Sequence, residues 1–338
     1  MTRPEPRRSA ALPRRRAALL GACLCALLAL GPAGRARAAG LTTLRVGYLS
    51  FIDTMVLFHA RTGGYFKRAG LRVRTLRVND GPAVIAAVRS GSADIGLTAA
   101  TPVAIAFERG QKLALFATST FELWPASPNL VTLVAAKRSG ITTLAGLKGR
   151  TIASNAQSSA CMIAIAQHLA SAGLTMRDVK VLIVPFPNMM AALALGEADA
   201  ACTVVPFLTA MTANPAVAPV VLARGTVAGL DKIHRLAVAG YFARPGWLAG
   251  HRAVLARFLG AMQAAQDDLD AHHARFRAGL VRYFHMPPAF AAKVPFALST
   301  SSLVARPADY QPLFDALHGA GLLARPLPAA RLVTTIAP

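Results

Sequence analysis

The chain has 338 residues, of which 54% are hydrophobic and 15% charged, with 37 Lys and Arg against 15 Asp and Glu. This composition excludes a disordered chain and a coiled coil, and the length allows two domains that each bury a core. Four cysteines over this length exclude a small disulfide-rich scaffold. The net charge is +22, but after residue 38 the basic residues are scattered singly, without an aromatic-interleaved stripe, so we expect no nucleic-acid partner.

The first 38 residues have the pattern of a secretory signal peptide. An arginine-rich leader precedes an apolar segment at 17–30, a Gly-Pro break and an Ala-Arg-Ala site that ends at Ala38. No later apolar run approaches the roughly 20 residues that cross a bilayer. We therefore expect export to the periplasm, with a twin-arginine route left open by Arg15-Arg16. Cys23 lies in a segment that resembles a lipoprotein box, so a lipid anchor is the alternative.

Strand and helix patterns alternate along the next sixty residues. The predicted strands are 44–48, 71–78 and 93–98, and the predicted helices are 55–67 and 83–89. Asp80 stands before Gly-Pro, where its side chain would cap the second helix. A further helix is predicted to begin at Thr101-Pro102, where Thr101 would be the cap and Pro102 the first helical residue.

The same order of elements recurs about 105 residues later. Strands are predicted at 150–153 and 179–184, and helices at 158–172 and 188–195. Gly-Glu-Ala-Asp at 196–199 then matches Gly-Ser-Ala-Asp at 91–94. Alternating strands and helices predict parallel βαβ units, and two copies predict an α/β protein with two lobes.

The remaining segments predict that the second lobe interrupts the first. Residues 121–129 are expected to be an irregular connection, and strands at 130–135 and 236–242 lead into and out of the second lobe. The last hundred residues are expected to pack back on the first lobe as helices, at 247–269, 271–284, 288–296 and 309–318. These segments divide the mature chain into lobe 1 (41–128 and 244–338) and lobe 2 (129–243), joined by a two-strand hinge.

Two cysteines, Cys161 and Cys202, remain after the signal peptide. An oxidising compartment permits a bridge, which requires the two Cα atoms to lie within about 7 Å. The sequence favours two buried free thiols, with a disulfide as the alternative.

The ligand site is predicted between the lobes, because ligands of open α/β sheets bind beyond the carboxyl ends of the strands. The loops at these ends are 50–54, 79–82, 98–102, 154–159, 185–188 and 204–207. The candidate ligand-binding residues in them are Ser50, Phe51, Asp53, Thr54, Thr98, Thr101, Ser154, Gln157, Ser158, Ser159, Phe186 and Asn188.

For several of these candidates, a structural role such as helix capping is the alternative to ligand binding. Ser158, Ser159 and Thr101 would cap helices or contact ligand, and free amides at a helix start favour an anion or a carbonyl oxygen. Asp53 would cap the first helix or accept from an ammonium or ring N–H. No loop contributes Lys or Arg, although Arg77 ends just short of one, so a sulfonate or nitrate would be held by amides and hydroxyls.

Aromatic residues near these loops have two interpretations. Phe51, Phe121, Trp124 and Phe186 could wall a pocket for a flat or aliphatic ligand, or belong to the core.

Catalytic motifs are absent from the sequence: there is no Gly-x-Ser-x-Gly, phosphate loop, Cys-x-x-Cys or His-Glu-x-x-His. The one histidine pair, His272-His273, occupies successive positions, which point to different faces of a helix. Cys161, considered as a nucleophile near a helix start, has no partner base that the sequence identifies. We expect a binding protein that is not an enzyme, with no cofactor and no metal.

Six segments carry a resemblance to a known family. They are Leu-Arg-Val-Gly-Tyr at 44–48, Gly-Tyr-Phe-Lys-Arg-Ala-Gly-Leu at 64–71, Gly-Ser-Ala-Asp-Ile-Gly at 91–96, Ser-Gly-Ile at 139–141, Leu-Ala-Gly-Leu-Lys-Gly at 144–149 and Ala-Ser-Ala-Gly-Leu at 170–174. With this order and spacing the chain resembles periplasmic solute-binding proteins of ABC importers. The similarity is to the nitrate, sulfonate and taurine branch, which also includes binders of thiamine-pyrimidine precursors.

This resemblance implies a type II periplasmic binding protein fold, closure of the hinge on a small-molecule ligand, and docking of a monomer on an inner-membrane permease with separate ATPase subunits. It implies a sulfonate-, nitrate- or taurine-like anion as ligand. A flat neutral or aromatic solute, such as a pyrimidine precursor or aromatic carboxylate, is the alternative, and a non-transport enzyme on the same fold is a third possibility. One segment departs from the family: Val-Val-Pro-Phe at 204–207 stands where Trp-Glu-Pro-Phe is frequent.

Overall fold

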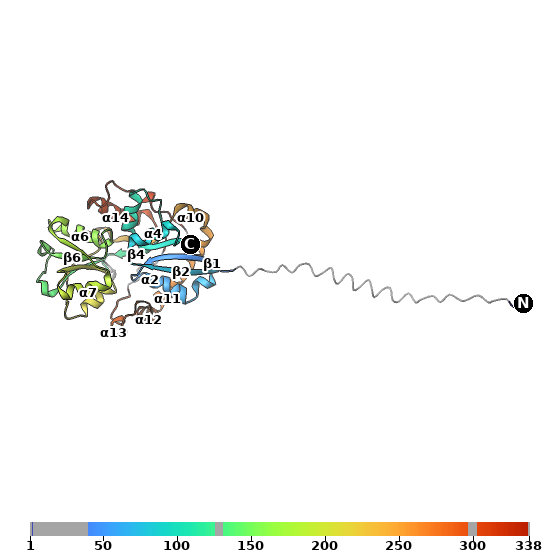
Figure 1. Cartoon of the computed structure of the whole chain (residues 1–338), viewed down its shortest axis with the longest axis horizontal. Coiled ribbons are helices and arrows are strands. Elements are labelled where there is room, and N and C mark those ends of the chain that lie inside the picture. Colours follow the sequence, from blue (N-terminus) through green and yellow to red (C-terminus); the bar gives the residue numbers. More distant parts are fainter. Residues whose placement is uncertain (1, 3–39, 126–130, 297–302, 337–338) are drawn as a thin grey trace. The chain divides into compact units, whose positions relative to one another are not determined.

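Two five-stranded sheets, each flanked by helices, form the framework of the protein (Figure 1). The computed structural model describes residue 2 and residues 40–125, 131–296 and 303–336. Residues 41–338 constitute one compact unit. The predicted signal peptide and lipid-anchor site lie outside the described residues, apart from Thr2.

The first sheet has the strand order β2-β1-β3-β10-β4. Its strands are β1 (Thr42–Leu49), β2 (Leu71–Val78), β3 (Ile95–Ala99), β4 (Ala114–Leu123) and β10 (Arg235–Ala243). β1 pairs in parallel with β2 and β3, whereas β10 is antiparallel to both β3 and β4.

The second sheet repeats this arrangement in the order β7-β6-β8-β5-β9. Its strands are β5 (Thr132–Ala135), β6 (Thr151–Ser154), β7 (Lys180–Ile183), β8 (Ala200–Thr203) and β9 (Val220–Arg224). β6 is parallel to β7 and β8, and β5 is antiparallel to β8 and β9. The internal repeat read from the sequence is therefore confirmed in the topology.

The sheets are mixed rather than mainly parallel. The fourth strand of each sheet comes from a segment that crosses between the sheets, so it runs against its neighbours. β10, expected to lead out of the second lobe, pairs in the first sheet. This pairing favours a lobe boundary near Arg235 over one after Ala243.

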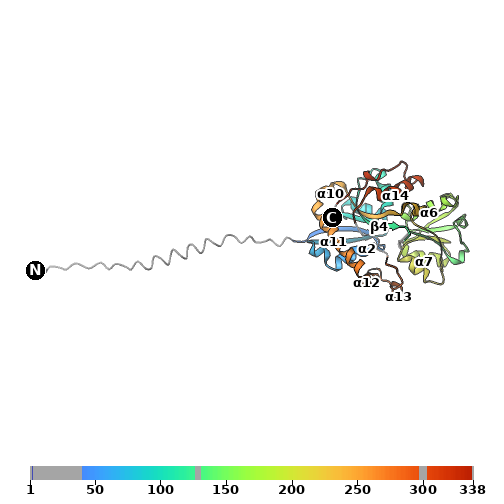
Figure 2. The same ribbon diagram turned by 180° about the vertical axis from the view of Figure 1, so that it is seen from behind.

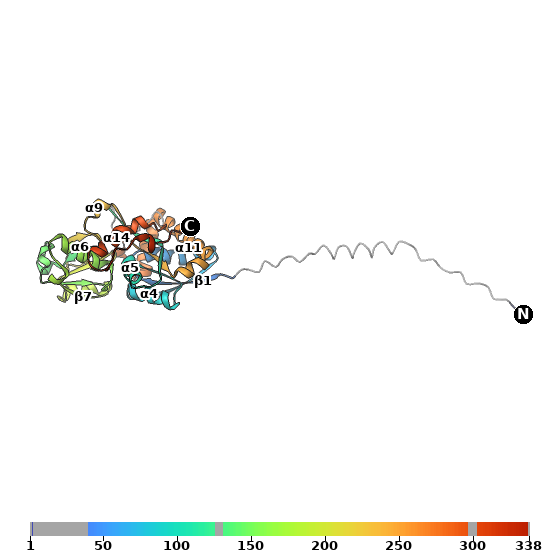
Figure 3. The same ribbon diagram turned by 90° about the horizontal axis from the view of Figure 1, so that it is seen from above.

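Helices cover both faces of the first sheet (Figures 1 and 3). One face packs against α2 (Thr54–Thr62), α3 (Tyr65–Arg68), α11 (Arg252–Ala271) and α12 (His273–Phe284). The other packs against α4 (Gly81–Ser90), α5 (Ala100–Glu108) and α14 (Pro307–Gly319). The C-terminal helices thus return to the first lobe, as expected.

The second sheet lies between α6 (Ala160–Ser171) and α7 (Phe186–Leu195), which flank it above and below in Figures 1 and 2. Its core includes Leu133, Ile152 and Met189, all fully buried or nearly so. α14 of the first lobe lies beside α6, where Gln167 Nε2 donates to the Ala316 carbonyl at 3.2 Å.

Several predicted segments differ in the structure. The helix predicted at 247–269 is interrupted at His251, between α10 (Pro245–Gly250) and α11, and the helix predicted at 288–296 extends only over α13 (Pro288–Ala291). The helix predicted at 55–67 is two helices, because Gly64 adopts a left-handed φ of +76° that ends the regular winding. The connection predicted at 121–129 begins as strand, since Phe121, Glu122 and Leu123 pair with β10. Residues 126–130 lie outside the described part.

The repeated Asp has the same structural role in each lobe. Asp94 Oδ2 accepts from the Arg45 backbone N–H at 2.8 Å, and Asp199 Oδ2 accepts from the Thr151 N–H at 3.0 Å. Arg45 also forms an ion pair with Asp94 at 2.6 Å. Each carboxylate stands at the amino end of β3 or β8 and ties it to the neighbouring strand.

Cys161 and Cys202 form a disulfide with Cα atoms 5.5 Å apart. The prediction of two free thiols is wrong. α6 packs over the sheet, which brings its first turn within reach of β8. This contact is tertiary, and the sequence spacing does not reveal it.

No helix in the described ranges has the length and apolar content to span a membrane. Among the same residues, no cluster of three His, Cys, Asp or Glu side chains is arranged to hold a metal ion.

Candidate functional site

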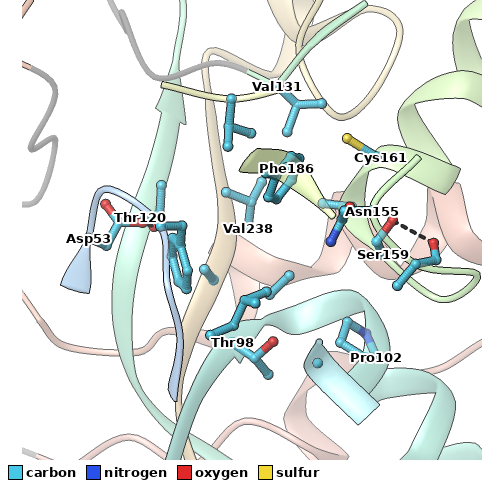
Figure 4. Close-up of a pocket in the computed structure, with 18 of the residues that line it drawn as sticks. Asp53, Thr98, Pro102, Thr120, Val131, Asn155, Ser159, Cys161, Phe186 and Val238 are labelled. Atoms are coloured by element: carbon cyan, nitrogen blue, oxygen red, sulfur yellow. Dashed lines mark hydrogen bonds between the residues drawn. The ribbon is translucent and has the colours of Figure 1, made fainter. Parts of the chain in front are cut away.

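A cavity of about 80 Å³, called here the inner cavity, lies where the strand-end loops of the two sheets meet (Figure 4). Each of the six loops selected from the sequence contributes at least one lining residue. The lining residues are Leu49, Phe51, Ile52, Asp53, Gly81, Thr98, Ala99, Pro102, Thr120, Val131, Asn155, Ala156, Ser158, Ser159, Ala160, Cys161, Phe186, Val204, Val205, Val238 and Ala239.

The first lobe supplies Phe51 and Asp53 from the turn after β1, and Thr98 from the end of β3. Gly81, the first residue of α4, allows a close approach here. A Cβ at this position would lie 2.7 Å from Pro102 Cγ and 2.9 Å from Thr98 Oγ1. Asp80 caps α4 as predicted, accepting from the Ala83 N–H at 2.8 Å.

The second lobe supplies the turn between β6 and α6, opposite Asp53 and Thr120 in Figure 4. Ser159 caps α6, since its Oγ accepts from the Met162 N–H at 3.3 Å and donates to the Ala156 carbonyl at 2.9 Å. The same side chain lines the cavity, so capping and a ligand-facing position coincide. Ser158, half-buried, lines the cavity without capping the helix.

Part of the cavity lining comes from residues outside the six predicted loops: Thr120 of β4, Val131 before β5, and Val238 and Ala239 of β10. These residues belong to the segments that run between the lobes. The sequence did contain an indication of these residues: segments that connect two lobes must pass close to the cleft between the lobes.

Six candidates lie outside the inner cavity lining. Thr54 is buried and donates to the Phe51 carbonyl at 2.7 Å, and Ser154 is buried with its Oγ 3.3 Å from Ser159 Oγ. Gln157 and Asn188 are exposed. Ser50 lines an adjoining chamber described below, and Thr101 is the sixth.

Thr101 lies inside α5 rather than at its cap, because the helix begins at Ala100 with Ala99 as N-cap. The prediction of a Thr101 cap is therefore wrong. Its buried hydroxyl has no hydrogen-bond partner among the described residues, and it does not line the inner cavity.

Asp53 does not cap α2, although it occupies the N-cap position. Its backbone is helical (φ −70°, ψ −16°), whereas a capping residue is extended. Its Oδ2 accepts from Thr120 Oγ1, and its Oδ1 has no partner in the described part of the chain. The side chain is almost fully buried, and burial raises the pKa of Asp53 well above its ordinary value.

The inner cavity is electrostatically sparse. Asp53 is the one ionisable side chain among the residues that line it, since Cys161 is bridged. Thr98 Oγ1 and Asn155 Oδ1 are also buried without described partners. The remaining walls are largely apolar, and the site can offer a few hydrogen-bonding groups on an apolar surface.

A second, wider chamber of about 660 Å³ adjoins the inner cavity and shares Leu49, Asn155 and Phe186 with it. The ring of Phe186 stacks on Phe207 at 5.5 Å and 15°. Arg77, whose direction the sequence left open, lines this outer chamber.

The aromatic candidates separate into two groups. Phe51 and Phe186 line the inner cavity. Phe121 is buried in the core beneath the Arg235 guanidinium, which lies 3.7 Å from its ring centre, and Trp124 is 42% exposed.

Comparison with known proteins identifies the chain at two levels. The profile of the NMT1/THI5 like family matches residues 52–274. No curated protein matches the sequence significantly.

Solved structures match the fold over most of the chain. The alkanesulfonate-binding protein SsuA from Xanthomonas axonopodis pv. citri, bound to MOPS, is 22% identical with a TM-score of 0.73, covering 87% of this chain and 99% of that protein. The periplasmic aliphatic sulphonate binding protein SsuA from Escherichia coli is 19% identical with a TM-score of 0.70, at 86% and 97% coverage. The periplasmic nitrate-binding protein NrtA from Synechocystis PCC 6803 is 16% identical with a TM-score of 0.61, at 74% and 69% coverage. The chain belongs to the NMT1/THI5-like family and has the two-lobe fold of the periplasmic binding proteins.

Proposed function

We propose that this protein is the extracytoplasmic solute-binding component of an ABC importer and is not an enzyme. The supporting observation is the inner cavity, whose lining comes from the strand ends of both lobes. A site divided in this way binds more strongly when the lobes are together. The cavity holds a single titratable side chain, Asp53, where paired acid–base chemistry would need two.

Closure couples binding to transport. A ligand that contacts both lobes shifts the population from open to closed, and moving from 1:99 to 99:1 takes about 10⁴-fold preference for the closed form. The closed monomer then docks on an inner-membrane permease whose ATPase subunits are separate chains. We place the protein in the periplasm, after cleavage of the signal peptide.

For the solute, we favour a flat neutral or aromatic compound that presents an N–H group to Asp53, as a pyrimidine precursor would. Phe51 and Phe186 offer apolar contact to a ring, and Thr98 and Asn155 offer unpaired oxygens to its substituents. A protonated Asp53 can also donate to a ring nitrogen, which suits a carboxyl whose pKa burial raises.

A sulfonate-, nitrate- or taurine-like anion is the second candidate. The first turn of α6 faces the cavity through Ala160 and Cys161, preceded by Ser158 and Ser159, and backbone amides at a helix start favour negative charge. The inner cavity has no lysine or arginine in its lining to neutralise such an anion. An anion would therefore enter a largely apolar cavity without a compensating charge, which makes it the less favoured ligand.

Two questions can be tested together: whether the protein binds a small solute, and which class of solute it binds. The measurements are thermal-shift and calorimetric titrations with 4-aminopyrimidine, cytosine, benzoate, taurine, methanesulfonate and nitrate. A true ligand at a hundredfold excess over its dissociation constant should stabilise the fold by about 2.7 kcal/mol. We expect a ring with an amino group to bind and nitrate and taurine to fail. Asp53→Asn should weaken that binding at least tenfold, whereas the same change at the exposed Asp231 should leave it unchanged.

The outcomes separate the two parts of the proposal. Binding of taurine or nitrate without the amino-substituted rings would overturn the solute class and leave the transport function standing. Failure of all six probes, together with no small molecule released from the purified protein, would contradict solute binding itself.

A further inference from the structure

Glu122, near the carboxyl end of β4, is a fully buried carboxylate at the point where the chain passes between the sheets. Its Oε1 accepts from the Val131 N–H at 2.8 Å and from Thr226 Oγ1 at 3.1 Å. Its Oε2 accepts from the Thr226 N–H at 2.7 Å. Val131 immediately precedes β5, where the chain enters the second sheet, and Thr226 follows β9, where it leaves. One side chain of the first sheet therefore holds both crossings.

The two crossings are also joined to each other and to the second lobe. The Gly225 N–H donates to the Val131 carbonyl at 2.7 Å. The Gly225 carbonyl lies 2.8 Å from Nε2 of His168, a buried residue of α6. Val131 also lines the inner cavity, so these bonds reach the ligand site directly.

We propose that Glu122 is a positioning residue of the hinge. Its negative charge holds both crossings in place. Its protonation releases the crossing at Thr226, where the chain returns to the first sheet, and so changes the separation of the lobes. An ionised carboxylate accepts all three hydrogen bonds. A protonated carboxyl carries a hydrogen on one oxygen. On Oε2 this hydrogen would face the Thr226 N–H, and on Oε1 it would face the Val131 N–H unless the Thr226 hydroxyl turned from donor to acceptor. Protonation therefore breaks a backbone bond or reverses the bond to the Thr226 hydroxyl, and it removes the negative charge that strengthens all three bonds.

The charge on Glu122 changes near neutral pH. Burial raises its pKa to about 7, against the opposing effect of the bonds from Thr226 and Val131. The neighbouring strand β10 carries Arg235, whose guanidinium lies over Phe121 and pairs with Asp309 at 3.3 Å. Burial lowers the pKa of His168, which holds the same crossing from α6, against the opposing effect of its bond to the Gly225 carbonyl.

Glu122→Gln separates charge from shape. The amide side chain has nearly the same shape as the carboxylate. Each carboxylate oxygen accepts from a backbone N–H, so the NH₂ group that replaces one of them must face either the Val131 or the Thr226 N–H. This variant should therefore resemble the protonated wild type at every pH. The measurement needs no ligand, so it remains informative if the proposed solute is wrong.

The test is the distance between spin labels on Asn79→Cys and Gln157→Cys, two exposed positions on opposite lobes, in the ligand-free mature protein. We expect the distance distribution to change between pH 5.5 and pH 8.5 with a midpoint near 7. Glu122→Gln should give the acidic wild-type distribution at both values. A wild type without pH dependence, or a Glu122→Gln variant that keeps all of it, would overturn the proposal.

Two further variants guard against a folding defect. Thr226→Val keeps the backbone N–H and the side-chain volume but removes the hydroxyl donor, so it should raise the pKa of Glu122 and move the midpoint to higher pH. A midpoint that stays or falls would contradict the proposal. Glu197→Gln makes the same chemical change at an exposed position after α7, and its curve should match the wild type.

Discussion

At the residue scale, Ser158 and Ser159 are neighbours with different duties. Both line the inner cavity, but only Ser159 caps α6. We expect Ser159→Ala to lower the free energy of unfolding by about 1 kcal/mol, as loss of a capping hydroxyl does. Ser158→Ala should leave it within about 0.5 kcal/mol, since this half-buried side chain makes no hydrogen bond to another residue in the described part of the chain. Urea denaturation of each variant measures this, and equal losses would contradict the division of roles.

The buried Glu122 also predicts how stability depends on pH. The folded protein keeps a proton on Glu122 up to about pH 7, whereas the unfolded chain releases it near 4.5. Between these values the folded state binds more protons, so ionisation of Glu122 lowers the free energy of unfolding as pH rises, by roughly 3 kcal/mol in all.

The difference between wild type and Glu122→Gln isolates this contribution, because other titrating groups are common to both proteins. The wild type should lose stability relative to the variant from pH 5 to pH 8 in urea titrations. A constant difference would mean that Glu122 does not change its charge in this range.

At the element scale, the disulfide joins the first turn of α6 to β8 and so fixes the ligand-facing turn to the sheet. The two cysteines are 41 residues apart, and closing a loop of that length in the unfolded chain accounts for roughly 3–4 kcal/mol of stability. We expect Cys161→Ser with Cys202→Ser to lose about this much in urea denaturation. Wild type under reducing conditions serves as the comparison, and a double variant as stable as the oxidised wild type would contradict the assignment.

The repeated Asp predicts a paired effect on the two sheets. Asp94→Ala and Asp199→Ala each remove an acceptor from a strand N–H, which costs about 1–3 kcal/mol. Because both carboxylates lie at the amino ends of the strands, away from the inner cavity, ligand affinity should stay within twofold. Denaturation and titration of the two variants measure these effects, and a tenfold loss of affinity would show that the motif acts on the site.

At the scale of the whole molecule, the signal-peptide pattern predicts that the chain is exported. Cleavage after Ala38 leaves 29 basic and 14 acidic residues in the mature protein. We expect the exported protein to begin at Ala39, which the intact mass of a periplasmic fraction would reveal. A mass that includes residues 23–38 with added lipid would instead indicate an anchor at Cys23.

The elements that the sequence predicts well are those with local causes. β2 has alternating apolar positions, α4 begins at an Asp-Gly-Pro cap, and the Gly-x-Ala-Asp segment precedes a central strand in each half. The split between α2 and α3 was missed because Gly63-Gly64 can stand inside a helical pattern until the backbone is seen to adopt φ > 0.

Order and spacing of local patterns determined that this is a two-lobe α/β protein with its cavity at the strand ends, because connection lengths and handedness leave few ways to pair such strands. The tertiary structure decided the rest: the Cys161–Cys202 bridge, the partner of Asp53 and the bonds of Glu122 to both crossings. Each joins residues distant along the chain, and their meeting depends on how whole elements pack.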